Sequence, residues 1–211
     1  MKIASFELGP VATNCFLFWE EEGEEAVLVD APQGAWRNIE PVLEQEGLKL
    51  SKLLLTHGHW DHMMGAARIK EEQDIETWGH EADRRLFAEP AIMSAFAMPG
   101  MNLDPIEIDH WVGEGDVVEI LGRQAEVRHV PGHCPGNILF YLEEEKMALV
   151  GDAIFAGSIG RTDLPGGDFE VLAKAIRERI YTLPDEVVLL PGHGPSTTVA
   201  HEKATNPYVP G

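Results

Sequence analysis

The sequence contains few cysteines, few basic residues and no long apolar segment. Its 211 residues include only two cysteines, Cys15 and Cys134, which are too few for a disulfide framework and favour a reducing compartment. Residues 1–7 lack the apolar core of a secretory signal, and no apolar run is long enough to span a bilayer. We therefore expect a cytoplasmic protein that does not enter a membrane.

Basic residues are outnumbered by acidic ones. Lys and Arg number 16 against 36 Asp and Glu, which gives a formal net charge of −20 at pH 7. A surface this acidic repels nucleic-acid phosphates and anionic membranes, so we expect neither among the partners. The chain also lacks Gly-Lys-Ser/Thr and Gly-x-Gly-x-x-Gly motifs, and Ser158 lacks the preceding glycine of a nucleophile elbow. Nucleotide binding and serine catalysis are therefore not predicted.

Length and composition favour one soluble domain over residues 1–211, because 44% of the residues are hydrophobic and 25% are charged. The apolar periods predict strands and helices in two successive halves. The first half has strands at 2–8, 14–20, 26–30, 53–56 and 75–78, with helices at 36–46 and 63–72. The second has strands at 116–120, 125–130, 138–142, 147–150 and 187–190, with a helix at 169–180. This order predicts an α/β (α+β) protein with two sheets packed face to face and helices outside.

Two segments have no clear period. Residues 80–110 place Met93, Phe96 and Met98 among alanines and prolines, which indicates either core filler or a lid over the site. Residues 201–211 are polar with two prolines, so we expect little regular structure there beyond a turn of helix.

The densest chemical feature follows the apolar run 53–55. His57, His59, Asp61 and His62 stand there within six positions. Neutral imidazole and carboxylate are common ligands of zinc and similar metals. A helix would scatter these side chains around its circumference, so the spacing predicts a tight loop that leads into a helix near His62. Crowding four such groups without a cation would be unfavourable, so we predict a metal site.

Further metal-type residues follow other apolar strands. His133, Asp152 and His193 each occupy a turn after such a strand, beside glycines that allow close approach of the backbone to a cation. Asp30 ends the predicted strand 26–30, where it serves either as a turn cap or as a partner that orients a metal-bound histidine. His129 lies inside its strand and is interpreted as structural.

In this order the motifs resemble those of the metallo-β-lactamase superfamily, over nearly the whole chain. The resemblance implies a four-layer αββα sandwich that holds two divalent metal ions. Carried over by motif, the first ion would be bound by His57, His59 and His133, the second by Asp61, His62 and His193, and both would be bridged by Asp152. Zinc is the expected metal, with iron or manganese as alternatives, because such donors accept all three.

Two segments narrow the resemblance. Residues 157–168 and 191–195 resemble short glyoxalase II-type proteins, which are hydroxyacylglutathione hydrolase-like. Long members of that group add a C-terminal helical domain that binds glutathione, and we expect residues 1–211 to lack it. Cys134 stands where the family often has threonine, either as a small residue or as an oxidisable thiol.

The expected reaction is hydrolysis of a small-molecule thioester or ester, such as S-lactoylglutathione, by a hydroxide that bridges the metals. A thiolate, whose parent thiol has a pKa of about 8.5, leaves without a strong general acid. This suits a site whose catalytic carboxylates, Asp61 and Asp152, are committed to metals. Arg161 is predicted to anchor a substrate carboxylate, with a surface ion pair as the alternative.

Two other functions stay open. A persulfide dioxygenase of the same fold resembles the chain at residues 160–163 and would bind one iron through His57, His133 and Asp152. A non-catalytic metal-binding or redox-sensing module would instead use Cys134. The sequence does not decide the oligomeric state.

Overall fold

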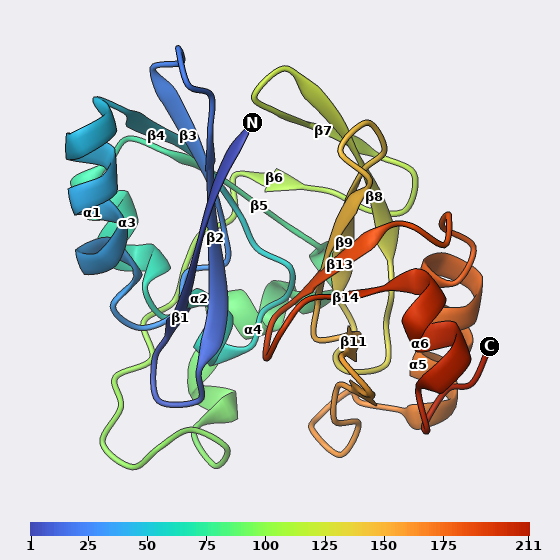
Figure 1. Ribbon diagram of the computed structural model, residues 1–211. Helices are drawn as coiled ribbons and strands as arrows, with labels where there is room; N and C mark the ends of the chain where they lie inside the picture. Colours follow the sequence, from blue (N-terminus) through green and yellow to red (C-terminus); the bar gives the residue numbers. More distant parts are fainter. The chain divides into compact units, whose positions relative to one another are not determined.

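The structure, a computed structural model, describes all 211 residues and divides them into two compact units (Figure 1). The first unit comprises residues 1–79 and 83–111, and the second comprises 80–82 and 112–211. Each unit contains one six-stranded sheet. The predicted division into two β-rich halves is therefore confirmed, whereas the single domain over residues 1–211 stays a prediction.

The sheet of the first unit is half antiparallel and half parallel. Its strands, in spatial order, are β1 (Lys2–Leu8), β2 (Thr13–Trp19), β3 (Glu25–Val29), β4 (Lys49–Leu54), β5 (Glu76–Gly79) and β6 (His110–Trp111). The first three strands pair antiparallel and the last three continue in parallel from β3. Because β3 and β4 are parallel, Asp30 and the loop after Leu54 emerge at the same edge of the sheet.

Helices cover one face of this sheet. They are α1 (Ala35–Glu46), α2 (Trp60–Met63), α3 (Ala66–Glu72) and α4 (Arg84–Ala88). Figure 1 shows α1 and α3 side by side, and Ile39 and Ile69 of these helices share a buried core with Leu17 and Leu28 of the strands. As the sequence predicts, α1 ends at Gly47, whose φ of 69° is left-handed and suits glycine.

Three strands in the sheet of the second unit run in the same direction and end at the same edge. Its spatial order is β14 (Thr197–Thr198), β13 (Val188–Pro191), β10 (Met147–Gly151), β9 (Ile138–Leu142), β8 (Arg123–His129) and β7 (Val117–Ile120). Strands β10 and β13 are parallel, and β8 runs in the same direction because β9 is antiparallel to both β8 and β10. A small hairpin, β11 (Ile154–Phe155) with β12 (Ser158–Ile159), follows β10.

The helices of the second unit pack on its sheet. Helix α5 (Phe169–Ala175) continues as the π-helical turn η3 (Ile176–Ile180), and α6 (Val199–Thr205) comes near the C-terminus (Figure 1). Leu172 and Ile176 share a core with Leu139 and Val150, as the helical period of 169–180 predicts. Phe169, the first residue of the helix, is exposed instead.

Two sequence expectations need correction. The stretch 201–211 contains most of the seven-residue α6, which begins at Val199 because the Thr198 side chain caps it. Residues 80–110 contain the 3-10 turns η1 (Glu81–Asp83) and η2 (Pro90–Met93). Met93 is buried in this segment and fills the core. Phe96 and Met98 are exposed instead. The lid stays a prediction. No helix has the length and apolarity needed to cross a membrane.

Candidate metal centre

The first unit carries four of the predicted metal ligands where β4 gives way to α2. His57 and His59 lie in the connecting loop, and Asp61 and His62 lie in the first turn of the helix. The predicted tight loop and the helix near His62 are confirmed, and this helix begins at Trp60. The three histidines are buried and are therefore sheltered from water.

Within this loop the donor atoms lie in pairs. His57 Nε2 is 3.1 Å from His59 Nδ1, and His62 Nε2 is 3.5 Å from Asp61 Oδ2. Two ligands that each lie about 2.0–2.1 Å from a tetrahedral zinc ion are about 3.3 Å apart. Both pairs therefore have the separation of neighbouring ligands on one cation. The donor set of imidazole and carboxylate fits a divalent metal.

Asp30 orients this cluster. Its Oδ2 lies 2.8 Å from His62 Nδ1, and its Oδ1 accepts a hydrogen bond of 2.8 Å from the backbone N–H of Thr56. The Thr56 hydroxyl donates a hydrogen bond to Asp30 and also lies 3.1 Å from Nδ1 of His57. When Nδ1 of His62 donates to a carboxylate, Nε2 keeps the lone pair that a metal needs. These contacts agree with the predicted role of Asp30 as a partner of a metal-bound histidine, and that role stays a prediction.

Two supporting residues were missed by the sequence analysis. Thr13, from β2, donates its hydroxyl to Asp61 Oδ2 at 3.0 Å. Asp83, which is fully buried, accepts a 2.9 Å hydrogen bond from the backbone N–H of Gly58. A Cβ at Gly58 would lie 2.7 Å from the Cβ of Leu86, so only glycine fits against α4. No local pattern marks Thr13 or Asp83, because each contacts the loop across a long sequence separation.

The second unit brings its three predicted ligands together at one sheet edge. His133 follows β8, Asp152 follows β10 directly, and His193 follows β13. The Oδ2 atom of Asp152 lies 3.5 Å from His133 Nε2 and 3.4 Å from His193 Nε2. One carboxylate thus stands between two imidazoles at ligand-to-ligand spacing. Its bridging of two metals stays a prediction.

Backbone and amide contacts hold these ligands. His133 Nδ1 lies 2.8 Å from the carbonyl oxygen of Arg161, which leaves Nε2 facing Asp152. Asn137 accepts a 3.1 Å hydrogen bond from the backbone N–H of Asp152 through its side-chain oxygen. A Cβ at Gly160 would lie 1.9 Å from the Asp152 carbonyl oxygen. Sequence analysis missed Asn137, since an isolated asparagine is usually a turn residue.

Arg161 forms the ion pair that was the alternative to substrate anchoring. Its Nε and Nη2 atoms each lie 2.7 Å from a carboxylate oxygen of Asp163. The Arg161 guanidinium lowers the pKa of Asp163 to about 2, chiefly by hydrogen bonding. Both side chains are more than half exposed. Anchoring of a substrate by Arg161 stays a prediction.

His129 and Cys134 are further residues that the sequence analysis singles out. His129 is in β8 as expected, where its Nε2 lies 2.7 Å from the Pro135 carbonyl oxygen and its ring stacks on His80 at 4.0 Å. Burial, with the neighbouring His129 ring, lowers the pKa of His80 to about 4. Cys134 is fully buried.

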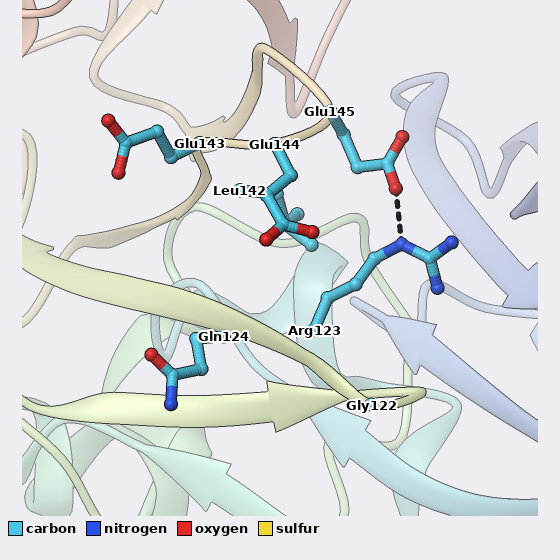
Figure 2. Close-up of a pocket in the computed structure, with 7 residues that line it drawn as sticks. All are labelled: Gly122, Arg123, Gln124, Leu142, Glu143, Glu144 and Glu145. Carbon is cyan, nitrogen blue, oxygen red and sulfur yellow. Dashed lines mark hydrogen bonds and ion pairs between the residues drawn. The ribbon is translucent and has the colours of Figure 1, made fainter.

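A separate hollow of about 310 Å³ lies where β8 begins and β9 ends (Figure 2). An ion pair between Arg123 and Glu145 crosses it. Its lining residues are Gly122, Arg123, Gln124, Leu142, Glu143, Glu144 and Glu145. Since β9 runs antiparallel to β10, this hollow is at the sheet edge opposite Asp152 and takes no part in the metal centre.

Comparison with known proteins decides the family. The sequence model of the metallo-beta-lactamase superfamily matches residues 8–193. The chain belongs to this superfamily. The hydroxyacylglutathione hydrolase GloC of Haemophilus influenzae is 39% identical, with 97% of this chain and 98% of that protein covered. The crystal structure of the BLEG-1 B3 metallo-beta-lactamase has a TM-score of 0.91 at 32% identity and covers 100% of both chains.

A further solved structure bears on the metal. The protein TTHA1623, crystallised in a di-iron-bound form, is 33% identical with a TM-score of 0.84, covering 97% of this chain and 99% of that one. The predicted superfamily and its α/β metallo-β-lactamase fold are therefore confirmed. The family and the His/Asp groups together support a metal-dependent hydrolase.

Proposed function

We propose that this protein is a dinuclear metal-dependent hydrolase of small-molecule thioesters, with S-lactoylglutathione or a related acyl thiol as substrate. The observation that carries the proposal is the spacing of the donor atoms, which lie 3.1–3.5 Å apart in pairs within each unit. The 39% identity to a hydroxyacylglutathione hydrolase supports the substrate class.

The pairs agree with a division of the ligands into two sets that share Asp152. His57 pairs with His59, Asp61 pairs with His62, and Asp152 lies beside both His133 and His193. The proposed first set is His57, His59 and His133, and the second is Asp61, His62 and His193. We propose zinc as the metal. Iron and manganese suit the same donors, and the similarity to a di-iron-bound protein favours iron as the alternative.

Metal ions held by these residues would supply hydroxide near neutral pH and polarise the substrate carbonyl. The protein's own contribution is orientation. Asp30 hydrogen-bonds to Nδ1 of His62, and the Arg161 carbonyl oxygen hydrogen-bonds to Nδ1 of His133. In both rings Nε2 is therefore left for a metal ion. Thr13 holds the carboxylate of Asp61.

This arrangement favours thioesters over amides. Asp61 and Asp152 serve the metals as carboxylates, so neither supplies the strong general acid that an amine leaving group requires. A thiol with a pKa of about 8.5 departs as thiolate without that proton. Arg161 remains our candidate for holding a substrate carboxylate. The substrate carboxylate would replace Asp163 as the partner of the guanidinium.

The test compares a thioester with a β-lactam, each offered to the metal-loaded protein. We expect hydrolysis of S-lactoylglutathione, with a lactam turned over at least about 100-fold more slowly, because loss of leaving-group protonation costs about 10²–10⁴-fold. The His59→Ala variant, matched by the exposed-site control Asp74→Ala, is expected to lose the thioesterase activity. Faster hydrolysis of the lactam would refute the proposal. Oxygen uptake with a persulfide, without thioester hydrolysis, would support the single-iron dioxygenase instead.

A further inference from the structure

Helix α6 contains a buried carboxylate that the proposed reaction does not use. Glu202 is fully buried, which is rare for glutamate. Its oxygens accept hydrogen bonds from the Thr197 hydroxyl at 2.5 Å, the Gly157 backbone N–H at 3.1 Å and the Asn206 amide at 2.8 Å. Burying a carboxylate is costly unless it is well hydrogen-bonded, so these three contacts indicate what Glu202 holds in place.

The side chains of Glu202 and Asn206 clasp the β11–β12 hairpin, which means that they hydrogen-bond to its backbone. Gly157 lies in its turn with a φ of 71°, and its N–H points to Glu202. Asn206 donates to Glu202 and, at 3.0 Å, to the carbonyl oxygen of Ser158. One side of the turn is thus held through its N–H and the other through its carbonyl.

The hairpin in turn contacts the proposed metal ligands. It begins just after Asp152 and leads into Arg161, whose carbonyl oxygen lies 2.8 Å from His133 Nδ1. The ring of Phe155 meets the ring of His193 edge-on, with centroids 5.9 Å apart. Thr197, the remaining partner of Glu202, stands four residues after His193. Glu202 therefore joins the two segments that determine where these histidines lie.

We propose that Glu202 is a positioning residue for the metal centre, which fixes His133 and His193 through the β11–β12 hairpin and Thr197. The inference rests on the proposed function only in taking these histidines as metal ligands. It requires one side-chain oxygen that accepts from the Gly157 N–H and the Asn206 amide, and a second polar atom that hydrogen-bonds to the Thr197 hydroxyl. It does not require the negative charge.

The test measures metal binding in Glu202→Ala and Glu202→Gln. Alanine leaves the hairpin N–H without this acceptor, and we expect zinc affinity to fall about 10–100-fold, as for other partners of metal ligands. Glutamine keeps one oxygen for Gly157 and Asn206 and donates its amide to the Thr197 hydroxyl, so we expect near wild-type affinity. Zinc affinity is measured by competition with a chromophoric chelator, and ligand geometry by the absorption spectrum of cobalt(II)-loaded protein.

The control is Tyr181→Phe, which removes the 2.7 Å hydrogen bond from the Tyr181 hydroxyl to the Val209 carbonyl oxygen. It loosens the same C-terminal segment without touching the hairpin, so we expect a lower melting temperature with unchanged zinc affinity and cobalt spectrum. Should Glu202→Ala fail to fold, Asn206→Ala tests the same clasp. A folded Glu202→Ala or Asn206→Ala protein with wild-type affinity and spectrum would overturn the proposal. Metal binding is measured without substrate, so its result can be interpreted even if the protein does not hydrolyse thioesters.

Discussion

Asp30 illustrates how one side chain contacts a predicted metal ligand from a neighbouring strand. Its backbone has a φ of 59°, a left-handed conformation that aspartate tolerates better than most residues. This turn at the end of β3 points the carboxylate at Thr56 and His62, which follow the parallel strand β4. The left-handed backbone is thus found where it directs the contact with His62.

Replacement of Asp30 tests that contact. In Asp30→Asn the amide can face His62 Nδ1 as a donor, which would force the proton onto the ring nitrogen needed by the metal. We expect Asp30→Asn and Asp30→Ala both to weaken metal binding about 10–100-fold, measured by chelator competition. Asp74→Asn, at an exposed site, is the matched control. Wild-type affinity in Asp30→Asn would show that the contact does not orient His62.

At this scale the sequence reveals the ligands better than their supports. His57, His59 and His62 are conspicuous because they are crowded beside a strand. Thr13 and Asp83 could not be found, since they lie 48 and 25 residues from their partners Asp61 and Gly58. Only the paired strands and the packing of α4 bring them to the loop.

Strand ends and helix starts place the predicted ligands of the second unit. Gly132, just before His133, is so close to α5 that a Cβ there would lie 2.3 Å from the Leu172 nitrogen. The helix begins with Asp168, whose carboxylate accepts a 3.1 Å hydrogen bond from the Val171 N–H and whose own N–H donates to the Gly132 carbonyl. The cap therefore ties the start of α5 to the turn that carries a ligand.

Loss of this cap is expected to destabilise the fold. Asp168→Ala leaves the Val171 N–H without its side-chain acceptor and should lower the free energy of unfolding by about 1 kcal/mol. Asp168→Asn keeps a capping oxygen and should stay close to the wild type. Urea unfolding of the three proteins measures the difference. Equal losses in both variants would show that capping is not the cause.

Long apolar elements were predictable and short ones were not. The strands β1, β9 and β10 have clear apolar runs and were predicted nearly at their observed bounds. β6, β12 and β14 have two residues each, too few to show a period. Helix α6 was underestimated because its sequence is polar, although Glu202 is buried inside.

The whole molecule carries an excess of negative charge, with 36 acidic against 16 basic residues. Mutual repulsion among these charges opposes the compact state, and added salt screens it. The ion pair Lys146–Glu186 is largely exposed, so its screening by salt costs little stability. The net effect of salt on stability should therefore be favourable.

We expect the melting temperature to rise as KCl is increased from about 0.02 M to about 0.3 M, over which the screening length shortens several-fold. Calorimetry at fixed pH provides the measurement. In a variant with Glu143→Gln and Glu144→Gln, which removes two exposed carboxylates beside the hollow of Figure 2, the rise should be smaller. A melting temperature that falls with salt would mean that attractive pairs outweigh the repulsion.

The central claim is the proposed hydrolysis of thioesters by two metal ions. The most direct measurement is thiol release from S-lactoylglutathione while zinc is added stepwise to metal-free protein, beside Asp152→Ala. We predict that the rate reaches its maximum when two ions are bound per chain, because hydroxide delivery is shared between two metals, and that Asp152→Ala stays inactive. Absence of thiol release with two ions bound, or full activity without Asp152, would contradict the account.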